Sequence, residues 1–239
     1  MAFQKRLLLQ AVAVAAAVDA LLYALLPRLM ELHSIATGAL LQLAQVPWRN
    51  GMTVTLLPGI TASLIHTTFL DYAAHPWYQV SFTAVVIPGA VVGFKRLPGP
   101  LKPLAVTVPA VLLASLFYLR FVSPQMPYSP EQFCAIWYRG EAYLWLLIPV
   151  LFALGFFVLD VPFALKVRWL CLLLGYSYIW SVVRLAFGLA TFHHFGSLWM
   201  PLYYLLFGFL ADFLYIVAIY SLAMDRAAAF LARQQEAWQ

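Results

Sequence analysis

Long apolar runs dominate this sequence and limit the folds that it can adopt. A helix that crosses the hydrocarbon core of a bilayer needs about 20 predominantly apolar residues. Six stretches meet that requirement: 7–28, 76–94, 101–121, 141–159, 167–190 and 199–223. Only 10% of the 239 residues are charged and 64% are hydrophobic, whereas roughly a quarter of a soluble domain is charged. The sequence therefore predicts an all-α polytopic membrane protein, a single membrane domain over 1–239 with six transmembrane helices.

Most basic residues lie at the ends of the apolar runs, on alternate ends of the predicted helices. They are Lys5, Arg6, Lys95, Arg96, Lys102, Lys166, Arg168, Arg226 and Arg233. Cytoplasmic loops of membrane proteins carry an excess of Lys and Arg, so this placement predicts that both termini and the tail 225–239 are cytoplasmic. The opposite side carries arginines as well, but every lysine falls on the cytoplasmic side. The net charge of +5 thus reflects topology, and we expect the lipid bilayer, not nucleic acid, as the partner.

The segment 29–75 is too long for a simple connection between two helices. Its first part, Leu29 to Val46, has apolar residues at helical spacing, which predicts a helix along the membrane interface. These residues are Leu32, Ile35, Leu40 and Leu43. The residues on either side of Pro58-Gly59 partly alternate between apolar and polar, which indicates a β-hairpin. We therefore expect a small outer-face insertion over 29–75, part helix and part hairpin.

Three ionisable residues inside the predicted spans are functional candidates, because a charged group in lipid is costly. Asp19 and Asp212 lie near the middle of the first and last helices, and Arg184 lies near the outer end of the fifth. One interpretation has the two aspartates facing each other through water or a cation, as a proton relay in a small transporter. The alternative is that these groups pair among themselves and fix the packing. The transporter is the weaker reading, because the sequence has no internal repeat.

Four residues of types used in nucleophilic catalysis fall at or near the predicted outer boundary: Cys134, Arg184, His193 and His194. A thiolate is the reactive form of cysteine, and a neighbouring cation favours it. An imidazole can move a proton, and a guanidinium can hold an oxyanion. We therefore consider these four as candidate catalytic residues, with a buried packing thiol as the alternative for Cys134. The histidine spacing predicts no metal site, and no motif predicts another cofactor.

The second half of the chain, 125–224, resembles the exosortase/archaeosortase family of membrane-embedded cysteine transpeptidases. The resemblance is one of layout: an outer-face cysteine, a helix, a basic cytoplasmic turn, a helix ending in an Arg motif, a short outer loop and a last helix. Ser181-Val-Val-Arg184-Leu is similar to the family's Asn-x-x-Arg-Ile/Leu stretch. His193-His194-Phe-Gly196 is similar to the loop that follows it.

This resemblance implies a function at the outer face of a bacterial inner membrane. The expected activity is cleavage of C-terminal sorting tails of exported proteins, which would be the substrates and partners and would enter laterally from the bilayer. Cys134 would attack the peptide carbonyl and Arg184 would stabilise charge. His193 or His194 would shuttle the proton.

The sequence departs from the family pattern at three places. The usual Cys-Ser-Gly is replaced by Cys134-Ala135-Ile136, and Ser181 occupies the Asn position. The family's downstream His stands four residues before a Gly in the last helix, and here that residue is Tyr204. The chain therefore reads either as a divergent member or as a relative without catalysis, similar to small membrane proteins that accompany exosortases. The alternative function is a non-catalytic integral membrane subunit that scaffolds or assembles an envelope complex.

Overall fold

The computed structural model describes residues 2–70, 85–86, 88–89, 91–123 and 129–236. Within these residues, five helices are long and apolar enough to cross a membrane. Their ranges are Arg6–Leu43, Lys102–Val122, Pro130–Phe157, Phe163–Phe195 and Ser197–Glu236. The predicted all-α class is therefore confirmed, and these helices suit a membrane by their length and composition. The second predicted span, 76–94, falls mostly outside the described residues, so the total of six spans stays a prediction.

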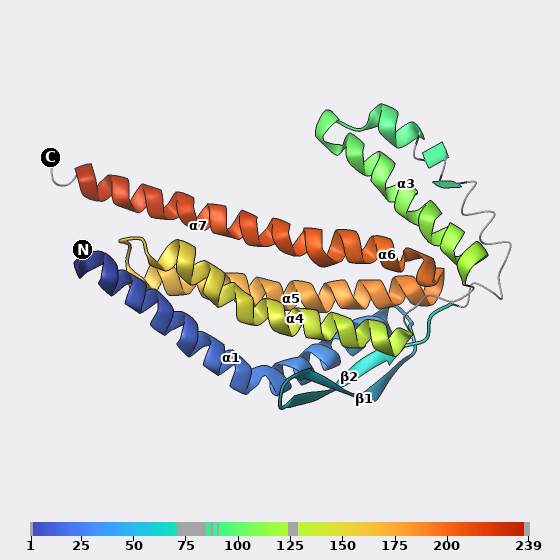
Figure 1. Ribbon diagram of the computed structural model, residues 1–239, viewed down its shortest axis with the longest axis horizontal. Coiled ribbons are helices and arrows are strands. Elements are labelled where there is room, and N and C mark those ends of the chain that lie inside the picture. Colours follow the sequence, from blue (N-terminus) through green and yellow to red (C-terminus); the bar gives the residue numbers. More distant parts are fainter. Residues whose placement is uncertain (1, 71–84, 87, 90, 124–128, 237–239) are drawn as a thin grey trace.

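Two helices occupy the centre of the bundle. α4 (Pro130–Phe152) begins at a capping box, in which Ser129 and Gln132 each accept a hydrogen bond from the other's backbone N–H, and it ends in a π-helical stretch. α5 (Phe163–Phe195) returns alongside α4 after a short loop. Figure 1 shows α1 on one side of this pair and α7 on the other. Both central helices therefore carry many buried side chains, which the outer helices cover.

The last part of the chain forms a long, nearly continuous helix. α6 (Met200–Tyr203) runs through a π-helical stretch, Tyr204–Leu210, into α7 (Ala211–Glu236). α3 (Lys102–Phe117), which follows a 3-10 turn at Gly99–Leu101 and continues as a π-helical turn over Tyr118–Val122, leans away from the bundle (Figure 1). It contacts the bundle at α6 and at the turn Ser197–Trp199 just before α6.

The first predicted span is part of a longer helix. α1 is continuous over Ala2–Leu43, so the helix end predicted at Pro27-Arg28 is wrong. A proline inside a helix removes one hydrogen bond and bends the helix without having to end it, and membrane helices tolerate this well. Figure 1 shows α1 changing direction partway along its length. The second half of α1 therefore lies across α4 and α5.

The second half of α1 turns polar side chains toward the bundle and several of its apolar side chains away from it. Leu32 and Ile35 are 56% and 57% exposed, while His33 and Thr37 are fully buried against the bundle. In lipid, apolar side chains gain little from burial, and polar side chains gain hydrogen bonds between helices. The segment therefore turns His33 and Thr37 inward and leaves Leu32 and Ile35 on the outside, where lipid can contact them. Its place along the membrane interface stays a prediction.

β1 (Trp48–Leu57) and β2 (Ile60–Thr67) pair antiparallel around Pro58-Gly59, where the alternation predicts a hairpin. Gly59 has φ +76° at the turn, a conformation that suits glycine. The hairpin packs on α1 and α4. It is held there by the Tyr23 hydroxyl, which donates to the Pro58 carbonyl at 2.7 Å, and by Arg139 Nε, which donates to the Thr55 carbonyl at 2.8 Å.

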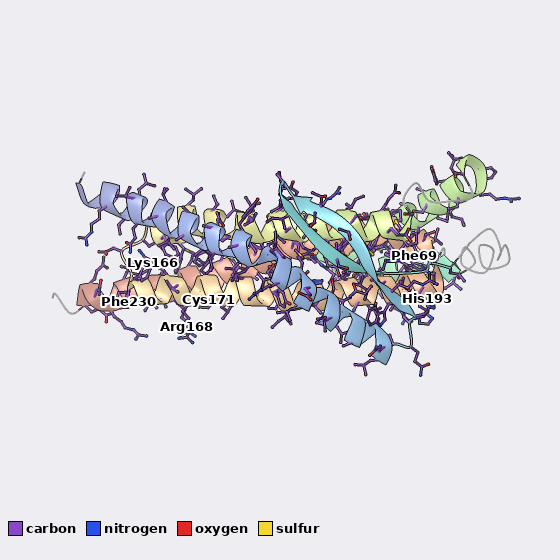
Figure 2. All side chains as sticks on the ribbon, turned by 90° about the horizontal axis from the view of Figure 1, so that it is seen from below. Phe69, Lys166, Arg168, Cys171, His193 and Phe230 are labelled. Atoms are coloured by element: carbon purple, nitrogen blue, oxygen red, sulfur yellow. The ribbon has the colours of Figure 1, made fainter. Side chains whose placement is uncertain are left out.

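Both ends of the chain described here lie at the same end of the molecule, with the α4–α5 loop (Figure 1). Figure 2 places Lys166 and Arg168 at that end, and Phe69 and His193 at the other. Lys166, however, is buried, and its ammonium donates to the Phe157 carbonyl at 2.7 Å. The ammonium thus satisfies a carbonyl at the C-terminal end of the preceding helix, where a cation is favourable.

A close approach of α5 to the chain that follows it gives a first testable prediction. A Cβ added at Gly188 would lie 2.7 Å from the Tyr203 ring, whereas a Cβ at Gly175 on the same helix would meet nothing within 4 Å. We expect Gly188→Ala to destabilise the protein by roughly 1–3 kcal/mol, because the ring must shift to make room. Gly175→Ala, the matched control, should cost nothing, and thermal unfolding of both variants in detergent measures the difference. Equal stability of the two variants would show that the Tyr203 ring is not held against α5.

Candidate functional site

The candidate site is built around a buried ion cluster that joins three helices. Arg184 of α5 is 2% exposed, and its guanidinium forms ion pairs with Glu141 of α4 and Asp212 of α7. Nη1 lies 2.7 Å from an Asp212 oxygen, and Nη2 donates to Glu141. A charge at membrane depth is tolerated where it faces the bundle interior and is paired. The cluster therefore binds α4, α5 and α7 to one another.

The π-helical stretch before α7 supplies further acceptors to Arg184. Nη1 also donates to the carbonyl oxygens of Phe207 and Gly208, the second at 3.2 Å. A π-helical turn disturbs the regular backbone hydrogen bonding of an α-helix and is frequent at functional sites. Here the carbonyls of the irregular backbone accept hydrogen bonds from the buried guanidinium. Such internal partners are needed inside a bilayer, because no water is present there to bind the carbonyls.

Aromatic rings close the cluster off. The Arg184 guanidinium lies over the Trp137 ring, 4.9 Å from its centre, an arrangement that favours a cation. Tyr203 donates from its hydroxyl to the Arg184 carbonyl. Three atoms of these residues have no hydrogen-bond partner among the described residues: Arg184 Nε, Glu141 Oε2 and Trp137 Nε1. Both terminal nitrogens of the guanidinium thus donate to groups of the protein itself.

A second group of buried polar side chains joins α1 to α4 and α5. His33 Nε2 and Ser181 Oγ share a hydrogen bond at 2.8 Å, and His33 Nδ1 lies 3.4 Å from the Thr37 hydroxyl. The hydroxyls of Ser34 and Tyr138 share another at 3.1 Å. Ser181 is three residues before Arg184 on α5, so this group lies about one helical turn from the ion cluster. Together the two groups form a polar interior inside an apolar bundle.

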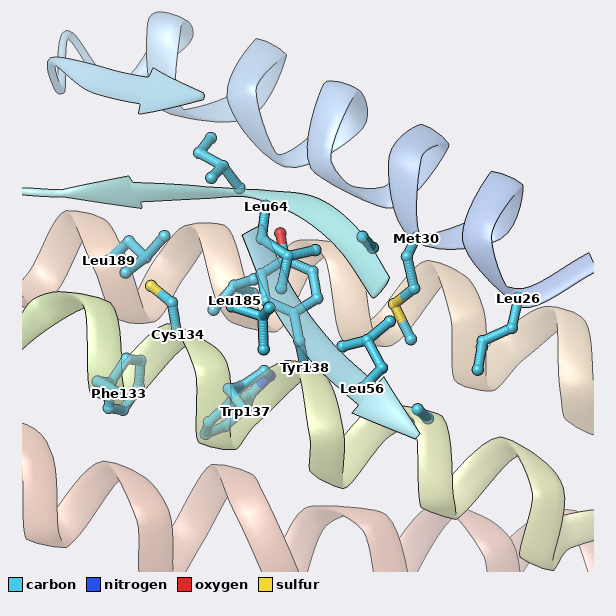
Figure 3. Packing of buried hydrophobic residues seen from close by; sticks show 14 of the residues in the cluster. Leu26, Met30, Leu56, Leu64, Phe133, Cys134, Trp137, Tyr138, Leu185 and Leu189 are labelled. Atoms are coloured by element: carbon cyan, nitrogen blue, oxygen red, sulfur yellow. The ribbon is translucent and has the colours of Figure 1, made fainter. Parts of the chain in front are cut away.

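The structure places Cys134 in the apolar core. The residue has 0% exposure and belongs to a cluster of buried apolar side chains that includes Phe133, Leu64 and Leu185. Figure 3 shows its sulfur among Leu185, Leu189 and the side chains of the hairpin. The described residues hold no hydrogen bond from a cation or an imidazole to this thiol. A thiol in such surroundings is favoured as the neutral, unreactive form.

The remaining predicted site residues lie apart from one another. His193 is half-buried near the end of α5, and its Nδ1 donates to the Thr68 carbonyl at 2.9 Å, next to the end of the hairpin. Its ring lies 5.1 Å from that of His194. Arg184 lies more than two turns before them on the same helix and is bound to its carboxylates. The structure thus brings Arg184 to the face of α4 that carries Trp137, one turn from Cys134, and leaves both histidines at the helix end.

Asp19 and Asp212, which one interpretation places face to face, have different surroundings. Asp212 is bound to Arg184. Asp19 lies on α1, and one of its carboxylate oxygens is buried without a hydrogen-bond partner among the described residues. The alternative prediction, that the intramembrane charges pair among themselves, holds for Arg184 and Asp212, because opposite charges at membrane depth attract strongly.

Two members of the site were not singled out from the sequence. Glu141 is the first residue of the predicted span 141–159. It lies seven residues after Cys134, and this helical spacing indicates that both share the inward face of α4. His33 falls within the predicted outer-face insertion 29–75, where the sequence gives it no role. Its spacing from Thr37, four residues on, was the signal that both lie on one helix face.

The chain matches no model of a known protein family, no curated protein and no solved structure. The resemblance to exosortases therefore rests on the residues of the chain alone. Among the described residues, no group of three His, Cys, Asp or Glu side chains is arranged to hold a metal ion.

The ion cluster gives a second prediction. Removing the cation by Arg184→Met leaves two carboxylates buried and unpaired, and we expect a loss of about 3–5 kcal/mol in unfolding free energy. Glu141→Gln keeps an acceptor for Nη2 and leaves Asp212 as the counter-ion, so its cost should be smaller. The triple variant Arg184→Met/Glu141→Leu/Asp212→Leu should recover part of the loss, because no buried charge remains. Unfolding of the purified variants in mixed micelles checks this order, and an Arg184→Met variant as stable as the wild type would contradict it.

Proposed function

We propose that this chain is a non-catalytic integral membrane subunit that scaffolds an envelope complex. The observation that supports this most is the state of the two residues needed for transpeptidase chemistry. Cys134 is sealed in the apolar core, and Arg184 is held by Glu141 and Asp212. A cysteine nucleophile must reach its substrate as a thiolate. A guanidinium that stabilises an oxyanion must direct its N–H donors at that oxyanion. Here neither group is directed at a site open to a substrate.

The hairpin is the docking surface of this proposal. Near the turn its exposed face carries small polar side chains in two cross-strand pairs, Thr53 with Ser63 and Thr55 with Thr61, and Arg49 is exposed farther along β1. A two-stranded sheet leaves edge groups available for pairing with an added strand. Because the hairpin is fixed to α1 and α4, it presents this surface without a large ordering cost.

A competing proposal, the cysteine transpeptidase that acts on C-terminal sorting tails, is favoured by one further contact. Tyr204, at the place of the family's His, packs its ring on Phe133 and Trp137, 5.2 and 5.7 Å away between ring centres. These two rings flank Cys134 along α4. The positions of the three expected catalytic residues thus converge on one stretch of α4, as the layout implies, although the third carries a phenol instead of an imidazole.

Reactivity of Cys134 separates the two proposals. In a Cys171→Ala background, we expect N-ethylmaleimide to label Cys134 in native membranes at least about tenfold more slowly than after denaturation, because a buried thiol is protected. The matched control is Ser63→Cys in a variant without Cys134 and Cys171, which carries a near-isosteric thiol on the exposed face of the hairpin. That thiol should react at once in both conditions.

Processing in the native host gives the decisive comparison. We expect Cys134→Ala, at matched membrane abundance, to leave the C-termini of exported proteins unchanged in mass spectrometry. Accumulation of uncleaved C-terminal tails in both Cys134→Ala and Arg184→Ala strains would replace the subunit proposal with the transpeptidase.

We also propose that the chain crosses a bacterial inner membrane six times, with both termini in the cytoplasm. The two termini and Arg168 lie at one end of the molecule, and His193 and the end of the hairpin lie at the other (Figures 1 and 2). This arrangement supports the orientation, because basic residues gather on the cytoplasmic side of membrane proteins. In cysteine-free protein, Ser63→Cys should react with a membrane-impermeant maleimide added to spheroplasts. Gln235→Cys should react only in inverted vesicles. The reverse pattern would overturn the orientation.

A further inference from the structure

A cavity of about 450 Å³ lies between α5 and α7, at the end of the molecule that holds both termini. α5 contributes Leu165, Arg168 and Trp169, and α7 contributes Arg226, Phe230 and Arg233. Figure 2 shows Arg168 and Phe230 at this end. The cavity is therefore amphipathic, with three guanidiniums beside two aromatic rings and an aliphatic side chain.

The three arginines are not used by the fold. None of them makes an ion pair or a hydrogen bond with another residue of the part of the chain that the structure describes. No acidic residue lines the cavity, although Asp225 is adjacent to Arg226 in the chain. Lys166, two residues before Arg168, is turned inward to the Phe157 carbonyl and does not line it. The cavity thus concentrates positive charge that has no partner within it.

The depth of the cavity matches the surface of a bilayer. Arg168 stands in the second turn of α5, at the start of its apolar run, and Arg226 follows the apolar part of α7 directly. Arg226 and Arg233 are seven residues apart on one face of α7, which spaces them by about 10 Å along the axis. Trp169 is half-buried beside them, in the position that tryptophan prefers at the membrane–water interface.

We propose that this cavity binds the headgroup of an acidic phospholipid. Guanidinium groups hold phosphate oxygens by paired, charge-assisted hydrogen bonds, and basic pockets between transmembrane helices bind anionic headgroups. The aromatic rings of Trp169 and Phe230 pack on the glycerol and the first carbons of the acyl chains. This proposal does not depend on the function proposed above.

The test is lipid retention by native mass spectrometry of protein purified from nanodiscs that contain phosphatidylglycerol or cardiolipin mixed with phosphatidylcholine. The wild type should retain acidic lipid in preference to phosphatidylcholine. Arg168→Gln/Arg226→Gln/Arg233→Gln should lower retention more than tenfold, since each basic residue near an anionic surface contributes about fivefold in affinity. Lys95→Gln/Arg96→Gln/Lys102→Gln, the charge-matched control, removes three cations that do not line the cavity and should retain lipid as the wild type does.

A second pair of variants tests the cavity with all arginines in place. Ala229 lines the cavity, whereas its neighbour Ala228 is exposed and does not. Ala229→Trp should fill the space and displace the lipid, and Ala228→Trp should have no effect. Because both positions lie on the surface of α7, folding is preserved in each.

Three outcomes would overturn the proposal. Equal loss of lipid in the two triple variants would show a general effect of net charge. Equal retention of phosphatidylcholine by the wild type would show that the headgroup is not selected. The third outcome concerns the melting temperature of delipidated protein. If inorganic phosphate or glycerophosphoglycerol raised that of the wild type as much as phosphatidylglycerol does, and the rise were lost in the triple arginine variant, the occupant would be a soluble phosphate compound.

Discussion

The fold depends on one buried guanidinium that binds groups from two other segments. Arg184 has ion pairs with Glu141 of α4 and Asp212 of α7, and it satisfies two backbone carbonyls of the π-helical stretch. Apolar side chains do not hold helices together in lipid, because lipid is already apolar. The specific relative positions of these helices must therefore come from polar contacts and close packing. The close packing is provided where the Tyr203 ring approaches Gly188. The hydroxyl of Tyr203 also donates to the Arg184 carbonyl, so the ionic contacts and the close packing lie at one place.

The polar interior continues into the second half of α1, which explains why that segment turns its apolar residues outward. His33 and Ser34 bond to side chains of α5 and α4, and those contacts are available on the inner face alone. Leu32 and Ile35 lose nothing by facing lipid. At these positions polar side chains are buried and apolar ones are exposed, although Met30 and Leu41 of the same helix are buried as well. The hairpin follows the soluble pattern instead, with Leu64 and Ile65 buried and Ser63 exposed.

The sequence predicted the parts of the structure that depend on local pattern. Apolar length predicted the membrane helices, and alternation around Pro58-Gly59 indicated the hairpin. What it did not predict are contacts between residues far apart in the chain, such as His33 with Ser181, which are separated by 148 positions. The pairing of Arg184 with Glu141 likewise joins residues of two helices, 43 positions apart in the chain. Pro27 was misleading because its effect on a membrane helix is to bend it rather than to end it.

The hairpin determines whether the resemblance to a cysteine enzyme has a chemical meaning. Leu64 and Ile65 of β2 belong to the apolar cluster that seals Cys134, so exposure of the thiol requires the hairpin to move. Four hydrogen bonds hold it and the residues that follow it, from Tyr23, Arg139, His193 and the Leu70 N–H to Phe192. Such bonds contribute about 0.5–1.5 kcal/mol each, and burial of each large aliphatic side chain adds about 1.5–3 kcal/mol. Opening by thermal motion alone is therefore rare. Exposure of the thiol would need free energy from outside the chain, such as that of a partner bound to an edge of the hairpin, and docking and exposure would then be one event.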